Sequence, residues 1–169
     1  MSVFEYNFEQ YKSLSPDLYR KEKYNLQVEL LKLQEDVIKK KRKIAICFEG
    51  RDTAGKSSTI NFFSEHLIPS NFNYVHLGIP TKKERKNWFE RYETYLPNKG
   101  QIVLFDRSWY TRALTEPTLG YCSKKQYEEF MTKVNKWEKS LVKKGTELVK
   151  FYFSIDKDQQ KRRINARKN

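Results

Sequence analysis

An apolar run at residues 44–48 leads into a glycine-rich octet at residues 50–57, and few folds accommodate that pair. The run is Ile-Ala-Ile-Cys-Phe, and the octet, Gly-Arg-Asp-Thr-Ala-Gly-Lys-Ser, matches the pattern G-x-x-x-x-G-K-[ST] at every fixed position. In this pattern a buried strand precedes a loop that curls around phosphate oxygens and opens a helix whose amides face the anion. The sequence therefore predicts strand, phosphate-binding loop and helix, in preference to a glycine turn that only caps a helix.

The loop supplies candidates for both phosphate and metal binding. Lys56 would reach the phosphates, and Ser57 would place its hydroxyl on Mg²⁺. A carboxylate among phosphates is electrostatically costly, so Asp52 suits a divalent metal ion or the orientation of an incoming phosphate; the alternative is a turn residue that bonds loop amides. The remaining candidates for phosphate or nucleotide binding are Gly50, Arg51, Thr53, Ala54, Gly55 and Ser58.

A second carboxylate follows the apolar run at residues 102–105. Asp106 would stand at the carboxyl end of a strand, the edge where open α/β sheets bind ligands. An acid in this position suits a Walker B aspartate that holds Mg²⁺ beside Ser57, and Arg107 could grip a transferring phosphoryl group with its planar fork. The alternatives are a helix N-cap for Asp106 and a surface ion pair for Arg107.

Four apolar runs and the segments between them indicate the fold class. Further runs lie at residues 74–77, 102–105 and 148–153, and the intervening segments are long enough for crossover helices. Helices are predicted at residues 21–40 and 59–67, at 87–96, and from a capping box at Ser123 and Gln126 to just before Gly145. We therefore expect an α/β domain with a mostly parallel sheet, in which residues 1–20 form an N-terminal arm and residues 21–169 the core.

The first predicted helix has one apolar face. Leu26, Leu30, Leu33 and Val37 recur at steps of four, three and four residues. That face could pack on the core or on a second subunit.

The chain carries a strong positive charge, with 34 Lys and Arg against 21 Asp and Glu, or +13 at pH 7. Such a charge attracts a polyanion, which could be nucleic acid, an anionic membrane surface or a phosphate-rich substrate. In the basic segment after the last strand, Arg163 and Arg167 share a helix face and could close over phosphates as a lid; the alternative is a solvated helix. Lys82 could line the groove in which these phosphates would lie.

Other features of the sequence exclude several classes. No apolar run approaches the roughly 20 residues of a membrane span, and the start of the chain lacks a secretory signal, so we expect a cytoplasmic protein that does not enter a membrane. Cys47 and Cys122 lack metal-ligand spacing, in keeping with a reducing compartment. We expect His66 and His76 to be structural.

Five segments together resemble the family 2 polyphosphate kinases. These are Phe-Glu-Gly-Arg-Asp-Thr-Ala-Gly-Lys at 48–56, His-Leu-Gly-Ile-Pro-Thr at 76–81, Leu-Phe-Asp-Arg-Ser-Trp-Tyr-Thr-Arg-Ala at 104–113, Gly-Tyr-Cys at 120–122, and 160–167. The resemblance extends from about residue 21 to the end, and the Asp-Arg-Ser-Trp-Tyr block is more specific than the phosphate loop.

The resemblance implies a P-loop kinase-like, three-layer fold of the thymidylate-kinase type. It also implies phosphoryl transfer between inorganic polyphosphate and a nucleoside mono- or diphosphate with Mg²⁺, or with Mn²⁺ in its place, so the expected partners are polyphosphate and nucleoside mono-, di- and triphosphates. At the matching positions, Asp52 and Asp106 would handle metal and acceptor, Lys56 and Arg107 would clamp phosphates, and Arg112 would contact phosphate or nucleotide. Homodimers or homotetramers are typical of the family, and nucleic acid is not an expected partner.

The chain departs from the family pattern at two places. Ser57-Ser58 stands where many members have Gly-Gly, which affects the expected acceptor geometry. Family members also continue past the basic helix into an Asp-Pro-Leu-Lys lid segment, so we expect part of the lid to be missing.

Two other functions share some of these features. An ATP-dependent nucleoside monophosphate kinase of the thymidylate-kinase type would have the same sheet and loop, although Arg51 and Asp52 inside the loop argue against it. A nucleic-acid-binding module would use the positive charge and the aromatic residues to hold a strand, but the aromatic residues fall at core positions of the predicted helices and strands.

Overall fold

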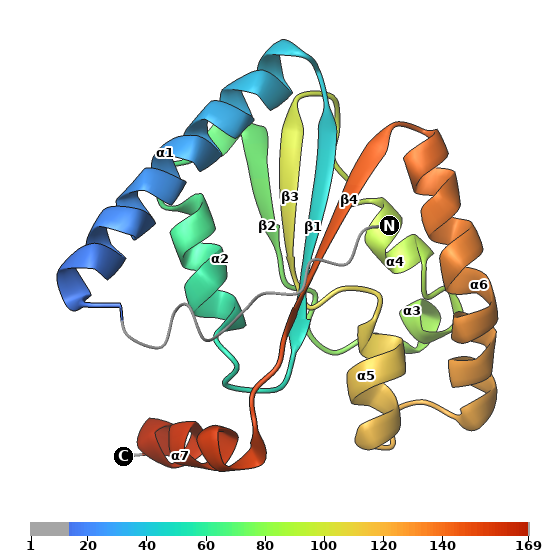
Figure 1. Ribbon diagram of the computed structural model, residues 1–169. Coiled ribbons are helices and arrows are strands. Elements are labelled where there is room, and N and C mark those ends of the chain that lie inside the picture. The colour runs from blue at the N-terminus through green and yellow to red at the C-terminus, as the bar shows by residue number, and fades with distance from the viewer. Residues whose placement is uncertain (1–13, 169) are drawn as a thin grey trace.

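The computed structural model describes residues 14–168, which form a four-stranded sheet between two layers of helices (Figure 1). The strand order is β2-β3-β1-β4, and every pairing is parallel. The predicted three-layer α/β architecture is therefore confirmed. In chain order the elements are α1 (Pro16–Lys39), β1 (Lys43–Gly50), α2 (Lys56–Ser64), the 3₁₀ helix η2 (Pro69–Asn71), β2 (Phe72–Val75), α3 (Lys82–Lys86), α4 (Glu90–Glu93), β3 (Gln101–Asp106), α5 (Thr111–Thr118), α6 (Lys124–Lys143), β4 (Thr146–Phe153) and α7 (Lys157–Lys168).

The core is divided by the sheet into two halves. Successive residues of a strand point to opposite faces, so Ile44, Ile46 and Phe48 of β1 pack toward α1 and α2, whereas Ala45 and Cys47 pack toward α4 and α6. Both faces of β1 and β3 are buried, which explains why these two strands are continuous apolar runs in the sequence. The principal partners from the helix layers and loops are Val37, Ile60, Trp88, Tyr92, Trp109, Phe130 and Val134.

The register of the two central strands brings two functional segments together. Phe48 on β1 pairs with Asp106 on β3, and the phosphate loop begins two residues after Phe48. The loop and the Asp106 turn therefore share the carboxyl edge of the sheet, where Figure 1 also places α5 and α7.

The first helix differs from its prediction in its start and in its buried face. It begins at Pro16, with Ser15 as N-cap, so residues 16–20 are helical and do not belong to an arm; residues 1–13 of the expected arm lie outside the described part. Leu26 is 64% exposed. The buried positions include Gln34, whose side-chain amide donates to Ile68 O at 3.0 Å and accepts from Ile68 N at 2.6 Å. Of the apolar stripe, Val37 is fully buried and Leu33 packs against the core, so the buried face combines part of the stripe with Gln34.

Two further elements differ from the expected ones. The helix expected at residues 87–96 is the single turn Glu90–Glu93, which is flanked by the buried Trp88 and contains the buried Tyr92. The last strand is an edge strand, with Val149 37% and Tyr152 61% exposed, and is not covered on both faces. By contrast, the capping box at Ser123 and Gln126 starts α6 as predicted.

Candidate active site at the carboxyl edge of the sheet

The phosphate loop requires glycine at its first position for steric reasons. Gly50 has a φ of +137°, and a Cβ there would lie 2.3 Å from the carbonyl oxygen of Phe153 on β4. Gly55, the N-cap of α2, has a φ of +102° but no neighbouring atom within 4 Å of a Cβ. The first glycine therefore allows β4 to approach the loop closely, whereas the second only allows the chain to turn.

We expect Gly50→Ala to destabilise the protein far more than Gly55→Ala. Both substitutions strain a positive φ, but only Gly50→Ala also drives a methyl group into β4, for a combined cost of roughly 3 kcal/mol against roughly 1 kcal/mol. Urea unfolding followed by circular dichroism measures both free energies. Equal losses for the two variants would contradict the proposed contact with Phe153.

Lys56 lies inside the curl of the loop. Its side chain is buried, and Nζ donates to Gly50 O at 3.0 Å and to Arg51 O at 2.8 Å. Burial, and next the charge of Arg107, hold the pKa of this ammonium below its usual value, while Asp106 acts in the opposite direction. The ammonium is thus positioned where an anion entering the loop would meet it.

Asp106 and Ser57 meet as the sequence predicted. Ser57 Oγ donates to Asp106 Oδ2 at 3.0 Å, and Tyr74 on β2 donates its hydroxyl to the same oxygen at 3.0 Å. Burial and this bond to Asp106 raise the pKa of Tyr74 to about 12. Among the described residues, no three His, Cys, Asp or Glu side chains gather as a metal site. A carboxylate with one hydroxyl still matches Mg²⁺, which commonly binds one or two protein carboxylates and completes its shell with phosphates and water.

Arg107 follows in a left-handed backbone conformation, with a φ of +64°. Its Nη1 donates to Thr115 Oγ1 on α5 at 3.1 Å. Arg107 lines two cavities, as does Thr115. By contrast, Asp106 lines only one of these cavities, Asp52 lines only the other, and Lys56 lines neither.

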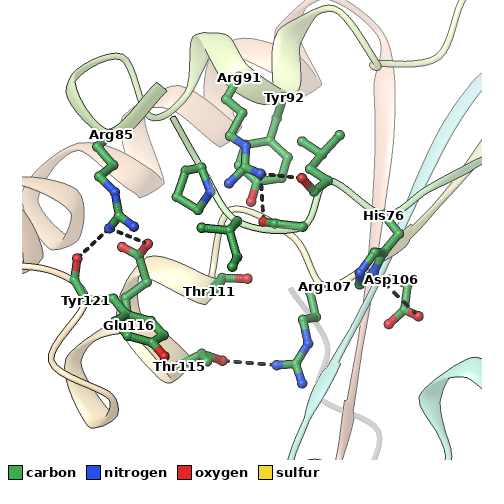
Figure 2. Close-up of a pocket in the computed structure, with 14 residues that line it drawn as sticks. His76, Arg85, Arg91, Tyr92, Asp106, Arg107, Thr111, Thr115, Glu116 and Tyr121 are labelled. Atoms are coloured by element: carbon green, nitrogen blue, oxygen red, sulfur yellow. Dashed lines mark hydrogen bonds and ion pairs between the residues drawn. The ribbon is translucent and has the colours of Figure 1, made fainter. Parts of the chain in front are cut away.

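The smaller cavity has a volume of about 350 Å³ and lies between the loop after β2 and helices α4 and α5 (Figure 2). Arg91 Nη2 donates to Leu77 O at 2.7 Å and to Gly78 O at 2.8 Å, which fixes that loop. On the opposite wall, Arg85 Nη1 donates to Tyr121 O at 2.6 Å and lies 3.6 Å from Glu116 Oε1. Burial raises the pKa of Glu116, against the effect of the neighbouring arginines. The cavity combines an apolar lining with charged groups held in place.

The larger cavity, of about 950 Å³, lies between the phosphate loop, α5 and α7. Its basic residues are Arg51, Arg107, Lys157 and Lys161. It is open enough to hold an extended anion along the loop.

Helix α7 is bonded to the phosphate loop. Arg167 Nη2 lies 2.9 Å from Asp52 Oδ2, Arg163 Nη1 donates to Thr53 O at 3.0 Å, and Gln160 Nε2 donates to Asp52 O at 3.2 Å. Because Arg167 stabilises the ionised form, the pKa of Asp52 is lowered. Asp52 thus pairs with Arg167 and lines the larger cavity, whereas Asp106 lines the smaller one.

Two predicted site residues lie elsewhere. Arg112 is 1% exposed, its Nε lies 3.1 Å from Glu116 Oε2, and its guanidinium stacks 4.0 Å from the ring centre of Trp88, so it does not face the phosphate loop. Lys82 begins α3, is exposed and lines neither cavity. The loop residues predicted to hold phosphate form one segment from β1 into the first turn of α2, which includes Gly50, Arg51, Thr53, Ala54, Gly55, Ser57 and Ser58.

The sequence did not reveal several residues of the site. His76, which we expected to be structural, places Nδ1 3.9 Å from Asp106 Oδ2 and is half exposed. The sequence pointed to Arg85 and Arg91 only indirectly, through the capping box of Thr81 and Glu84. That capping box starts α3 shortly before the two arginines. The lining of the smaller cavity by Tyr92, Thr115, Glu116 and Tyr121 depends on packing between distant segments.

Comparison with known proteins decides the family of this chain. The family model described as polyphosphate kinase 2 matches residues 13–169. The chain belongs to the polyphosphate kinase 2 family. Among curated members, it is 43% identical over 152 residues to a GDP-polyphosphate phosphotransferase of Pseudomonas aeruginosa, covering 89% of this chain and 43% of that protein. A GDP-polyphosphate phosphotransferase of Mycolicibacterium smegmatis is 45% identical over 150 residues, covering 88% and 53%.

Solved structures of family members agree with the fold. A polyphosphate kinase 2 from Arthrobacter aurescens superposes with a TM-score of 0.83 at 25% identity, covering 92% of this chain and 57% of that one. A Pseudomonas aeruginosa protein described as a polyphosphate kinase 2 gives 0.86 at 30%, covering 96% and 36%. The fold is thus the P-loop kinase-like fold of this family. The chain spans about half the length of the curated relatives it matches, and none of its described helices is long and apolar enough to cross a membrane.

Proposed function

We propose that the protein transfers a phosphoryl group between inorganic polyphosphate and a nucleoside mono- or diphosphate. The proposal rests chiefly on Arg107, whose side chain lines both cavities beside Asp106 and the phosphate loop. A planar guanidinium binds two phosphate oxygens at once, so it suits a group that passes between two sites. The names of its relatives support these substrates, since they include the GDP-polyphosphate phosphotransferases described above and an ADP-polyphosphate phosphotransferase of Pseudomonas aeruginosa that is 43% identical over 155 residues.

The two cavities differ in the substrate that they suit. The larger one has four cations along its walls and would hold the polyphosphate chain, which the overall charge of +13 also attracts. The smaller one, at about 350 Å³, falls within the range of small-molecule sites and would hold the nucleoside. Its apolar lining includes Leu77, Ile79 and Pro80, and Glu116 and Arg85 can meet polar groups of the base or sugar.

The chemistry needs two phosphates held in line. An oxygen of the terminal phosphate of the nucleotide attacks the terminal phosphorus of polyphosphate. The bond from that phosphorus to its bridging oxygen breaks, and the polyphosphate leaves one unit shorter. Lys56 and the loop amides orient the phosphates, and Arg107 stabilises the charge on the transferred group, so the part of the protein is positioning and electrostatic stabilisation.

A divalent cation completes this proposal. Asp106 and Ser57 would hold Mg²⁺, or Mn²⁺ in its place, and Asp52 would supply a further carboxylate once Arg167 turns to the phosphates. When bound, the ion would neutralise charge on the phosphate oxygens. Asp106, Ser57 and Asp52 provide the hard oxygen atoms that such ions bind.

Phosphorus NMR tests the donor directly. Purified protein with Mg²⁺, long-chain polyphosphate and ADP or GDP should produce triphosphate signals while the polyphosphate shortens, and AMP in place of the diphosphate should produce ADP. A chelator should stop the reaction. Transfer from ATP to a monophosphate, with none from polyphosphate, would contradict the proposal and support the ATP-dependent kinase.

A further inference from the structure

A buried carboxylate lies directly beneath the site and touches neither cavity. Glu49, on β1, is 6% exposed and immediately precedes Gly50. It lines neither the smaller nor the larger cavity. Burial raises its pKa, against the effect of its bonds and of the charges of Arg107 and Lys56. Because burying a carboxylate is costly unless it is well paired, its partners indicate what it stabilises.

The partners of Glu49 belong to a single residue at the end of β3. Ser108 donates both its backbone N–H, at 2.6 Å, and its hydroxyl, at 2.8 Å, to Glu49 Oε1. Ser108 is itself fully buried. The carboxylate of β1 therefore continues the strand pairing beyond Arg107, whose N–H still donates to a backbone carbonyl of β1.

These bonds enclose Arg107 on both sides. Its own N–H donates to Phe48 O at 3.1 Å, and the next N–H, of Ser108, goes to Glu49. Between them, Arg107 has the left-handed φ of +64°, a backbone conformation that is strained for a residue with a Cβ. Two consecutive residues of β1 thus hold a strained turn, and the phosphate loop starts at the very next residue of the same strand.

We propose that Glu49 is a positioning residue that fixes the Arg107 turn relative to the phosphate loop. Through Ser108 it keeps the guanidinium between the two cavities, beside Thr115, although Glu49 itself does not reach a substrate. This inference rests on the proposed phosphoryl transfer for its effect on rate. Its structural part, the conformation of the Arg107 turn, does not depend on that transfer.

A double-mutant cycle tests whether Glu49 acts through Arg107. Glu49→Ala should lower kcat about 10–100-fold, with the KM for the nucleotide little changed, because small misplacements of a positioned group have effects of this size. Glu49→Gln keeps an oxygen that can accept both Ser108 bonds and should stay within about threefold of the unmodified protein. The double variant Glu49→Ala/Arg107→Ala should be no slower than Arg107→Ala alone, since residues that act as a unit are not additive. Losses that multiply, or a Glu49→Gln variant as slow as Glu49→Ala, would overturn the proposal.

Crystal structures of Glu49→Ala and of the unmodified protein supply a readout that needs no turnover. We expect the φ of Arg107 to leave the left-handed region and its bond to Thr115 to be lost, with the β1–β3 register unchanged. An Arg107 turn that is identical in both structures would overturn the inference. Absence of polyphosphate turnover in the unmodified protein would instead contradict the proposed function alone. Glu147→Ala, at the far end of β4, serves as the carboxylate control and should keep both kcat and the turn.

Discussion

Asp106→Asn is expected to lower kcat for transfer from polyphosphate by about 1,000-fold. Asparagine has nearly the same shape and can still accept the hydrogen bonds of Ser57 and Tyr74, so the fold should persist. What is lost is a negative charge at the proposed metal position, and metal stabilisation of a transferring phosphoryl group amounts to several kcal/mol, or about 4 kcal/mol for this factor. Initial rates from phosphorus NMR at saturating Mg²⁺ measure the loss.

Asp17→Asn is the matched control for that variant. Asp17 lies in the first turn of α1 with an exposed side chain, and it lines neither cavity. It should keep the full rate. If Asp106→Asn is folded by circular dichroism and retains a rate within threefold of the control, Asp106 does not hold the metal.

Arg107→Ala is expected to lower kcat by on the order of 1,000-fold, the lower end of what an arginine aimed at a transferring phosphoryl group contributes. Arg107→Lys should recover only a small part, because lysine keeps the charge but loses the two-pronged geometry. Titration calorimetry with inorganic tripolyphosphate separates binding from chemistry in the same variants. If the variants bind tripolyphosphate more weakly but keep their kcat, Arg107 contributes to substrate binding and not to the transfer step.

Arg20→Ala, on the exposed side of α1, controls for the loss of one positive charge. Since the protein carries +13, removal of any one distant charge should change rates little at 0.15 M salt, where the Debye length is about 8 Å. A comparable loss in both variants would show that net charge, and not the position of Arg107, governs the rate.

The central part of the fold was predictable because it depends on local patterns. Residues 44–48 and 102–105 are buried on both faces, so their apolar character is continuous and visible in the sequence. The burial of Gln34 was not visible, because it depends on hydrogen bonds to Ile68, which is 34 residues away along the chain. The length of α4 was overestimated. Trp88 and Tyr92 are buried in the aromatic cluster around Trp109, and their burial does not require a longer helix.

The candidate site shows the same division. The meeting of Ser57 with Asp106 followed from motif spacing and from the rule that parallel strands end at one edge. Arg112 was misplaced because its partners, Glu116 four residues on and the ring of Trp88, hold it in the interior. The spacing of Arg112 and Glu116 on α5 was the available signal. The left-handed turn at Arg107 had no signal, because it depends on the buried Glu49.

The bond between Arg167 and Asp52 affects how the protein should respond to ionic strength. An entering phosphate chain that recruits Arg167 must first release it from Asp52, so one counter-ion is exchanged for another and little net charge is newly neutralised there. The affinity for polyphosphate should accordingly decline less steeply with added salt than a count of the surrounding cations suggests.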